Sequence, residues 1–220
     1  MEYLIAAIAD LHGEYPAIPE SDILLIAGDI NSGGIDSEEK QKNKINDLQS
    51  WLENIPVKII IASPGNHDIY LSKEGKKLNL PWIYLEDEGI ELEGISIYGM
   101  PWVPPIYGVF NAKESEIATK SSLIPENTDI VIAHGPPYGC NDLVGGEHVG
   151  STAFRKNIQT SNYGLVVSGH IHECFGRAKL RNKYGKDTII ANVSYADNLN
   201  PAQQFKFDTN TGIVQPLPWR

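Results

Sequence analysis

Cysteine is scarce in this chain of 220 residues, and long apolar runs are absent. The two cysteines, Cys140 and Cys174, provide neither a disulfide framework nor the CxxC spacing of a zinc site. The apolar run near the N-terminus, residues 4–9, is too short for a signal peptide or a membrane helix, and no basic segment precedes it. We therefore expect a soluble, cytoplasmic protein with no membrane partner.

Positive charge is also in short supply. Lys and Arg number 18 against 28 Asp and Glu, which gives a net charge of −10. Affinity for a nucleic-acid backbone comes mainly from Lys and Arg, so we expect no stable nucleic-acid complex. No repeat or linker divides the sequence, and its length fits one hydrophobic core. We predict a single domain over residues 1–220, and the sequence leaves the oligomeric state open.

Five short apolar runs, rich in Val, Ile and Ala, each end at residues of the types that bind metals. Continuous runs of this kind predict strands that are buried on both faces. In open α/β sheets, ligand sites lie beyond the carboxyl ends of such strands. The runs are residues 4–9, 23–27, 57–62, 130–133 and 165–168. We therefore expect the polar residues that follow them to meet in one place.

Other patterns complete a prediction of an α/β fold. Ser37 is a suitable N-cap for a helix that reaches Asn54 and is ended by Pro56, and a second helix is expected within residues 152–161. This strand–helix–strand order predicts that the first three strands are parallel neighbours. Alternation over residues 88–99 predicts an antiparallel hairpin. Further hairpin strands are expected at residues 188–193, 203–208 and 213–215.

The residues at the strand ends have the composition of a metal centre. Oxygen and imidazole donors without thiolates suit Mn, Fe, Ni or Zn ions. Seven ligands are too many for one four-coordinate zinc but suit two ions that share a carboxylate. Members of the pairs two residues apart would point the same way in an extended chain. The candidate ligands are Asp10, His12, Asp29, Asn66, His134, His170 and His172.

Two metal ions about 3.5–4 Å apart activate a water and bind the oxygens of a phosphate during in-line displacement. The leaving group then needs a proton, and a histidine is suited to provide it. His67, beside Asn66, is our candidate general acid. Asp68 either orients His67 or simply ends the loop. We assign catalysis to His67 and Asp68, and substrate contacts to Asn66, His67 and His134.

The order of these motifs resembles that of the calcineurin-like metallophosphoesterase superfamily. The resemblance implies a four-layer α/β/β/α sandwich of two mixed β-sheets flanked by helices. It also implies one metal held by Asp10, His12, Asp29 and His172, and a second held by Asp29, Asn66, His134 and His170, with Asp29 as the bridge. The motifs that carry it are Asp10-x-His12, Gly28-Asp29, Gly65-Asn66-His67-Asp68, His134-Gly135 and Gly169-His170-Ile171-His172.

The sequence differs from one group of this superfamily at two motifs, and these differences narrow the predicted function. Protein Ser/Thr phosphatases of this superfamily continue Gly-Asp with an Asp-Arg-Gly pattern and carry Glu after Asn-His, whereas this chain has Ile30-Asn31 and Asp68. The motifs look more like those of a small, single-domain phosphodiesterase-like subgroup. We predict a phosphodiesterase that acts on a small phosphodiester or nucleotide with two divalent ions, Mn being favoured. The alternatives are a phosphomonoesterase or nucleotidase with the same centre, and a non-catalytic scaffold.

Several other residues have two interpretations. His148 fits a surface loop better than the substrate cleft. The basic residues of segment 177–186 fit a solvated hairpin better than a phosphate-binding patch. Trp102, Tyr107 and Tyr138 could stack on a nucleobase or lie in the core or at the rim.

Overall fold

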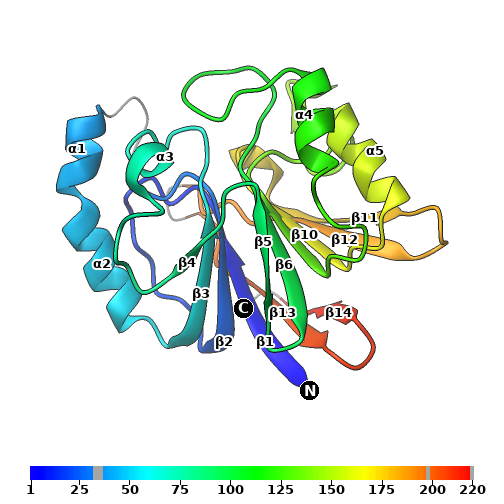
Figure 1. Cartoon of the computed structure of the whole chain (residues 1–220), viewed down its shortest axis with the longest axis horizontal. Helices are drawn as coiled ribbons and strands as arrows, with labels where there is room; N and C mark the ends of the chain where they lie inside the picture. The colour runs from blue at the N-terminus through cyan, green and yellow to red at the C-terminus, as the bar shows by residue number, and fades with distance from the viewer. Residues whose placement is uncertain (32–36, 197–198, 219–220) are drawn as a thin grey trace.

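Two six-stranded sheets pack face to face in this computed structural model, which describes residues 1–31, 37–196 and 199–218 (Figure 1). The first sheet has the order β14-β13-β1-β2-β3-β4. Its strands are β1 (Glu2–Ile8), β2 (Ser21–Ala27), β3 (Val57–Ser63), β4 (Ile83–Tyr84), β13 (Gln203–Asp208) and β14 (Ile213–Pro216).

The second sheet has the order β11-β12-β10-β7-β6-β5. Its strands are β5 (Glu88–Leu92), β6 (Ile95–Met100), β7 (Ile130–Ala133), β10 (Leu165–Ser168), β11 (Gly176–Arg181) and β12 (Asp187–Asn192). A separate small hairpin pairs β8 (Leu143–Val144) with β9 (Glu147–His148). Both large sheets mix parallel and antiparallel pairs, as the predicted fold class requires.

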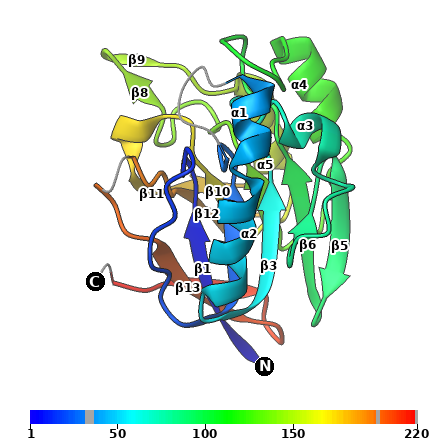
Figure 2. The ribbon, with the colours of Figure 1, turned by 90° about the vertical axis from the view of Figure 1, so that its left-hand side faces the viewer.

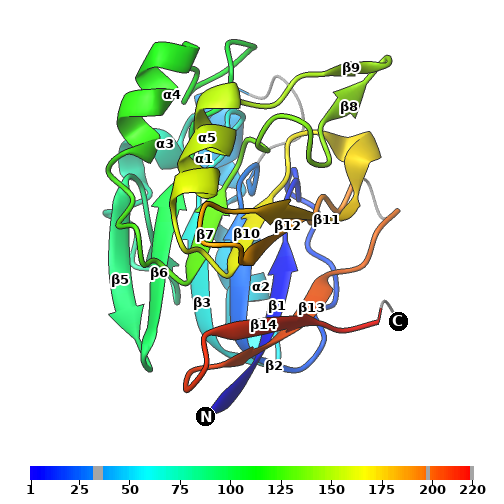
Figure 3. The ribbon, with the colours of Figure 1, turned by 90° about the vertical axis from the view of Figure 1, so that its right-hand side faces the viewer.

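Helices cover the outer face of each sheet, which gives the four predicted layers. On the first sheet lie α1 (Glu38–Asn43), α2 (Ile45–Asn54) and α3 (Leu71–Glu74) (Figure 2). On the second lie α4 (Glu114–Ser121) and α5 (Thr152–Thr160), visible in Figure 3. A short 3₁₀ helix, η1 (His172–Cys174), follows β10. In the described ranges, no helix is long and apolar enough to cross a membrane.

Alternate side chains of the central strands divide between two apolar layers. Ile5, Ile23 and Val167 belong to the cluster between the two sheets, whereas Ile8 and Ile26 pack beneath α2 and α3. The central strands are therefore buried on both faces, as their unbroken apolar runs predict. The predicted parallel order of the first three strands is confirmed, since β2 pairs in parallel with both β1 and β3.

The helix expected from Ser37 to Asn54 is divided in two at Lys44. Ser37 is the N-cap, and its side chain accepts a hydrogen bond from the Lys40 N–H, as predicted. The Lys44 N–H bonds back to the Gln41 carbonyl, three residues earlier, so the turn tightens there. The interruption lies directly after the segment in which the buried Gln41 contacts the loop that follows β3.

The predicted hairpin strands are present, and they are divided between the two sheets. β5 and β6 are joined by Glu93 and Gly94, both at positive φ (53° and 77°). Two-residue turns of this kind match the right-handed twist of paired strands. The expected C-terminal strands form β12, β13 and β14, but β12 joins the second sheet while β13 and β14 form the edge of the first.

Candidate metal centre

The loops that follow β1 and β2 are tied together by their backbones. The N–H of Asp10 donates to the Gly28 carbonyl at 2.9 Å, and that of His12 donates to the Asp29 carbonyl at 2.8 Å. Asp10, His12 and Asp29 all have left-handed φ angles, of 56°, 49° and 53°. His170, after β10, has one of 69°. The expectation that the paired ligands sit in extended chain is therefore wrong.

This backbone conformation has a physical meaning. A non-glycine residue in the left-handed region costs roughly 1–3 kcal/mol, which persists only where the surrounding structure determines it. Here four candidate ligands adopt it, each within four residues of a strand end. Turns, rather than strand alternation, bring these side chains to the same point.

Asp10, His12 and His172 form the first group. Their donor atoms all lie within 4.8 Å of one another. The Nε2 atoms of His12 and His172 are 3.2 Å apart, and the Nε2 of His172 is 3.5 Å from Asp10 Oδ1. Side chains 160 residues apart in the sequence thus direct their polar atoms at one point.

His134 is the centre of the second group. Its Nε2 lies 3.2 Å from Asp29 Oδ2 and 3.0 Å from Asn66 Oδ1. Its Nδ1 lies 2.8 Å from the carbonyl oxygen of Ala27. Because a carbonyl only accepts hydrogen bonds, Nδ1 carries a proton, and Nε2, which faces the two side-chain oxygen atoms, is the ring nitrogen that would bind a metal ion.

The two groups are continuous. Donor atoms of Asp10, Asp29 and His134 also lie within 4.8 Å of one another. The His170 backbone N–H donates to the Asp10 carboxylate at 3.0 Å, and its ring centroid is 5.1 Å from that of His134. The structure therefore brings together all seven residues that the sequence predicts as ligands.

The donor set fits divalent ions. Atoms bound to one ion at about 2.0–2.2 Å lie about 2.8–3.6 Å from each other at octahedral or tetrahedral angles. The separations of 3.0 to 3.5 Å around His134 and His172 fall in this range. Both aspartates are almost fully buried, at 1% exposure each. Two buried carboxylates this close together are stable only if positive charge compensates them.

The close packing of carboxylates and imidazoles in this centre also shifts their pKa values. Burial raises the pKa of Asp29, but the neighbouring His134 outweighs it and leaves that pKa well below its usual range. Burial lowers the pKa of His134, while Asp29 and Asp10 raise it more, to about 9. Burial, reinforced by the His134 charge, lowers the pKa of His170 to about 4.

Gly28 leaves room for the His134 ring. Its φ is +91°, and a Cβ there would lie 2.3 Å from His134 Nδ1. Gly65 makes an equally close approach, since its Cβ would lie 2.2 Å from Asp29 Oδ1. Glycine, which has no side chain, is therefore required at the two positions where these loops approach the candidate metal centre.

Asp68 connects the loops after β2 and β3. It is fully buried, and its carboxylate accepts hydrogen bonds from the backbone N–H groups of Ile30 (2.9 Å), Asn31 (3.1 Å) and Gly65 (2.8 Å). Burial, with the charge of Asp29, raises its pKa to about 6. These bonds give Asp68 a role in positioning the loop that carries Asn66 and His67.

His67 lies beside the ligand cluster. Its backbone N–H donates to Asp29 Oδ1 at 2.8 Å. Its ring centroid is 5.3 Å from that of His12 and 6.0 Å from that of Tyr107. Its imidazole, partly exposed, therefore borders the first group of candidate ligands.

Gln41 is a contributor that the sequence interpretation missed. This buried side chain donates from Nε2 to the His67 carbonyl at 2.7 Å and accepts from the Tyr70 N–H at 2.8 Å. It lies four residues before Ile45, at the spacing of the apolar helix face. A polar residue on the apolar face of a predicted helix was the sequence feature that could have identified Gln41.

The residues with two interpretations are now placed. Trp102 donates to Asp87 and lies under the Lys120 ammonium, so it is packed into the fold. Tyr107 and Tyr138 are exposed by 46% and 39%, so neither lies in the core. His148 is exposed, as expected, but its Nδ1 is held 2.7 Å from the buried Asp142 carboxylate. Arg177, in the basic segment, binds Gln203 and the Leu217 carbonyl.

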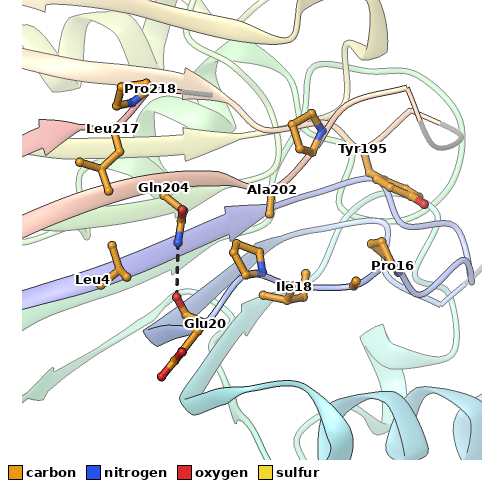
Figure 4. A pocket seen from close by; sticks show the side chains of 12 residues that line it. Leu4, Pro16, Ile18, Glu20, Tyr195, Ala202, Gln204, Leu217 and Pro218 are labelled. Carbon is orange, nitrogen blue, oxygen red and sulfur yellow. Dashed lines mark hydrogen bonds between the residues drawn. The ribbon is translucent and has the colours of Figure 1, made fainter. Parts of the chain in front are cut away.

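A separate cavity of about 610 Å³ lies between the loop before β2 and the C-terminal segment (Figure 4). Its walls include Leu4, Pro16, Ile18 and Leu217, and Gln204 donates to the Glu20 carbonyl across it. None of the candidate ligands lines it. Its lining is largely aliphatic and provides no cluster of catalytic groups.

Comparison with known proteins identifies the family. A family model described as calcineurin-like phosphoesterase matches residues 3–174. Metallophosphoesterase domain-containing protein 1 of Homo sapiens is 32% identical over 202 residues, covering 77% of this chain and 60% of that protein. A probable rhamnogalacturonate lyase C of Emericella nidulans is 29% identical over 190 residues, covering 79% of this chain and 17% of its own length.

A solved structure shows the same fold. The NAD nucleotidase of Haemophilus influenzae superposes with a TM-score of 0.58 and 14% sequence identity, over 100% of this chain and 49% of that one. At this identity the likeness concerns the fold alone. The chain spans about three-fifths of the human relative and about half of the nucleotidase.

Proposed function

The chain belongs to the calcineurin-like phosphoesterase family, and from this premise we propose that it is a two-metal phosphodiesterase for a small phosphodiester. The observation that carries the proposal is the continuity of the two donor groups through Asp10, Asp29 and His134. One ion would be held by Asp10, His12, Asp29 and His172, and the other by Asp29, Asn66, His134 and His170.

The bound ions, for which we favour Mn²⁺, supply positive charge for the phosphoryl oxygens and lower the pKa of the attacking water. The protein holds their ligands in place. Asn66 donates from Nδ2 to the Tyr107 carbonyl at 2.9 Å, which turns its Oδ1 toward His134. The Nδ1 bond from His134 to Ala27 fixes that imidazole in the same way.

His67 provides the proton for the leaving oxygen in this proposal. Its backbone is held on one side by Asp29, through its N–H, and on the other by Gln41, through its carbonyl. The backbone of His67 is therefore fixed, and its partly exposed imidazole would face the substrate. Asp68 supports it through the backbone of the loop, as a positioning residue.

A diester is favoured over a monoester by the shortage of cationic groups. The chain lacks the Asp-Arg-Gly pattern, and its strand-end loops contain no arginine to bind a doubly charged phosphate. The nucleotidase likeness supports the fold and leaves the monoesterase as the rival. The non-catalytic scaffold is disfavoured because every predicted ligand is present.

The test compares bis-p-nitrophenyl phosphate with p-nitrophenyl phosphate, after chelation and addition of Mn²⁺. We expect at least a tenfold higher kcat/KM for the diester. A preference for the monoester would reject the diesterase assignment. Protein that holds no transition metal and hydrolyses neither ester with Mn²⁺ would instead support the scaffold.

A further inference from the structure

Exposed apolar side chains gather on the loops around the candidate metal centre. They come from three separate segments, which follow β6, β7 and β12. Their exposed fractions range from 37% for Val144 to 80% for Leu199. We define as the apolar rim Ile106, Tyr107, Leu143, Val144, Val149 and Leu199.

The segment after β6 is bound directly to the centre. The Tyr107 carbonyl accepts the hydrogen bond from Asn66 Nδ2, and the Tyr107 ring lies 6.0 Å from the ring of His67. Val109, in the same loop, donates its N–H to the Asn66 carbonyl at 2.8 Å. A substrate that reaches His67 therefore meets Tyr107.

The β8–β9 hairpin is attached to the loop that carries His172. The Leu143 N–H donates to Cys174 Sγ at 3.2 Å, and that thiol lies 3.2 Å from the Leu143 carbonyl. Cys174 ends the 3₁₀ helix that begins at His172. Figure 3 shows the hairpin projecting at the end of the molecule toward which β1 runs.

Leu199 borders a hollow beside the same histidine. A cavity of about 500 Å³ is lined by His172, Glu173, Phe175, Ala196, Leu199 and Asn200. A cavity of this size accommodates a ring or short chain. Apolar side chains thus lie next to candidate ligands on two sides. Single exposed apolar residues scattered over a surface are common, whereas a group of them beside one site indicates binding.

The charge around the centre limits what can bind there. The loops that follow β1, β2, β3, β6, β7, β10 and β12 contain a single Lys or Arg, Lys113. Two cations approach from outside them: the Lys44 ammonium lies 2.9 Å from where a Cβ on Gly13 would lie, and Arg155 donates to the Tyr138 carbonyl at 2.7 Å. The acidic residues Glu147 and Glu173 are exposed on the same loops. Additional negative charge on a substrate would therefore find few cations.

Resting on the proposed function, we propose that the apolar rim binds the organic group of a singly charged phosphodiester, an aryl or alkyl group of at least phenyl size. The phosphoryl group occupies the metal centre, and the second ester group lies against the rim. Extra anionic groups, as in polyphosphates, are excluded by the acidic residues and the scarcity of Lys and Arg.

A substrate series with one leaving group tests this inference. Methyl, phenyl and 4-carboxyphenyl p-nitrophenyl phosphate all release p-nitrophenolate. With Mn²⁺ we expect kcat/KM to be about tenfold higher for the phenyl ester than for the methyl ester, mainly through KM. The carboxyphenyl ester, which adds one negative charge at similar size, should lose most of this gain.

Substitutions in the apolar rim then test whether these side chains cause the preference for the phenyl ester. Leu199→Ser and the double variant Leu143→Ser, Val144→Ser should each lower the phenyl-to-methyl ratio severalfold. Ile213→Ser, at a residue 59% exposed in β14, is the matched control and should keep the wild-type ratio.

Two outcomes would overturn the inference while Mn²⁺-dependent turnover persists. One is an equal kcat/KM for the methyl and phenyl esters. The other is a rim variant that converts a dimer to a monomer in sedimentation but keeps the substrate ratio, which would make the rim a contact between copies. Absence of turnover of every ester would instead count against the proposed function.

Discussion

The Asp29 carboxylate accepts the backbone N–H of His67 at 2.8 Å. One side chain thereby serves two parts of the proposed mechanism. It faces His134 Nε2 at 3.2 Å, as a bridging ligand would, and it fixes the loop that carries the proposed general acid. In the proposed mechanism, metal binding and placement of His67 are therefore coupled through Asp29.

Asp29→Ala should abolish activity, with kcat/KM reduced by at least about a thousandfold, because both proposed ions lose a shared ligand. Metal content by mass spectrometry should fall from two ions per chain to less than one. Asp47→Ala, at an exposed acid in α2, is the control and should keep both ions. Full metal content in Asp29→Ala would show that it does not bridge.

His67→Ala should keep both metal ions and lower kcat, because in the proposed mechanism the imidazole acts on the leaving group and is not a ligand. The loss should be about a hundredfold for poor leaving groups and smaller for p-nitrophenolate. A plot of log kcat against leaving-group pKa should become steeper than for the wild type. Loss of metal in this variant would contradict the assigned role.

Gln41→Leu should reproduce part of the His67→Ala effect, because it removes the hydrogen bond to the His67 carbonyl. It also leaves the partly buried Tyr70 N–H without its partner, at a cost of about 1–3 kcal/mol. The melting temperature should fall by a few degrees and the leaving-group dependence should steepen. Gln49→Leu, in α2 and bonded to Glu53 on the surface, should change neither quantity.

Gly28→Ala should weaken binding of one metal ion selectively, because the added Cβ would lie 2.3 Å from His134 Nδ1. Gly94→Ala is a matched control, since Gly94 also has a positive φ (77°) but no atom lies within 4 Å of its Cβ. Isothermal titration with Mn²⁺ should show a lost or weakened site in the first variant only. Equal effects would mean that backbone strain, and not the His134 contact, is responsible.

Chelation should destabilise the protein, because Asp10 and Asp29 are buried and lose the positive charge between them. An ion present at 100 times its Kd contributes about 2.7 kcal/mol. For a chain of this size, that corresponds to a rise in Tm of roughly 5–11 °C. Calorimetry before and after addition of Mn²⁺ checks this, and an unchanged Tm would argue against a resident metal.

The arrangement of the strands could be predicted because it depends on local patterns. Unbroken apolar runs such as Ile23–Ala27 can only be buried on both faces, and strand–helix–strand order makes β1, β2 and β3 parallel neighbours. The division at Lys44 was not predictable in this way. It accompanies contacts of Gln41 with residues 26 and 29 positions away in the sequence.

The same limit applies to the site. Sequence order was enough to name the seven candidate ligands, since parallel strands bring their carboxyl ends to one edge of each sheet. Those that follow β1, β2 and β3 belong to the first sheet and those that follow β7 and β10 to the second, so the packing of the two sheets decided that they meet. Sequence order was also not enough to orient them. Asp10 and His12 converge through left-handed turns, which hydrogen bonds to the next loop hold in place.

The sequence by itself determined which residues are the candidates for metal binding and catalysis, because residue type and strand-end position are both local properties. Only the tertiary structure decided that Asp68 supports the loop of His67 through three backbone N–H groups, and that Tyr107, Leu143 and Leu199 surround one centre. The physical reason is that loop conformation depends on long-range hydrogen bonds and packing, which no local pattern in the chain encodes.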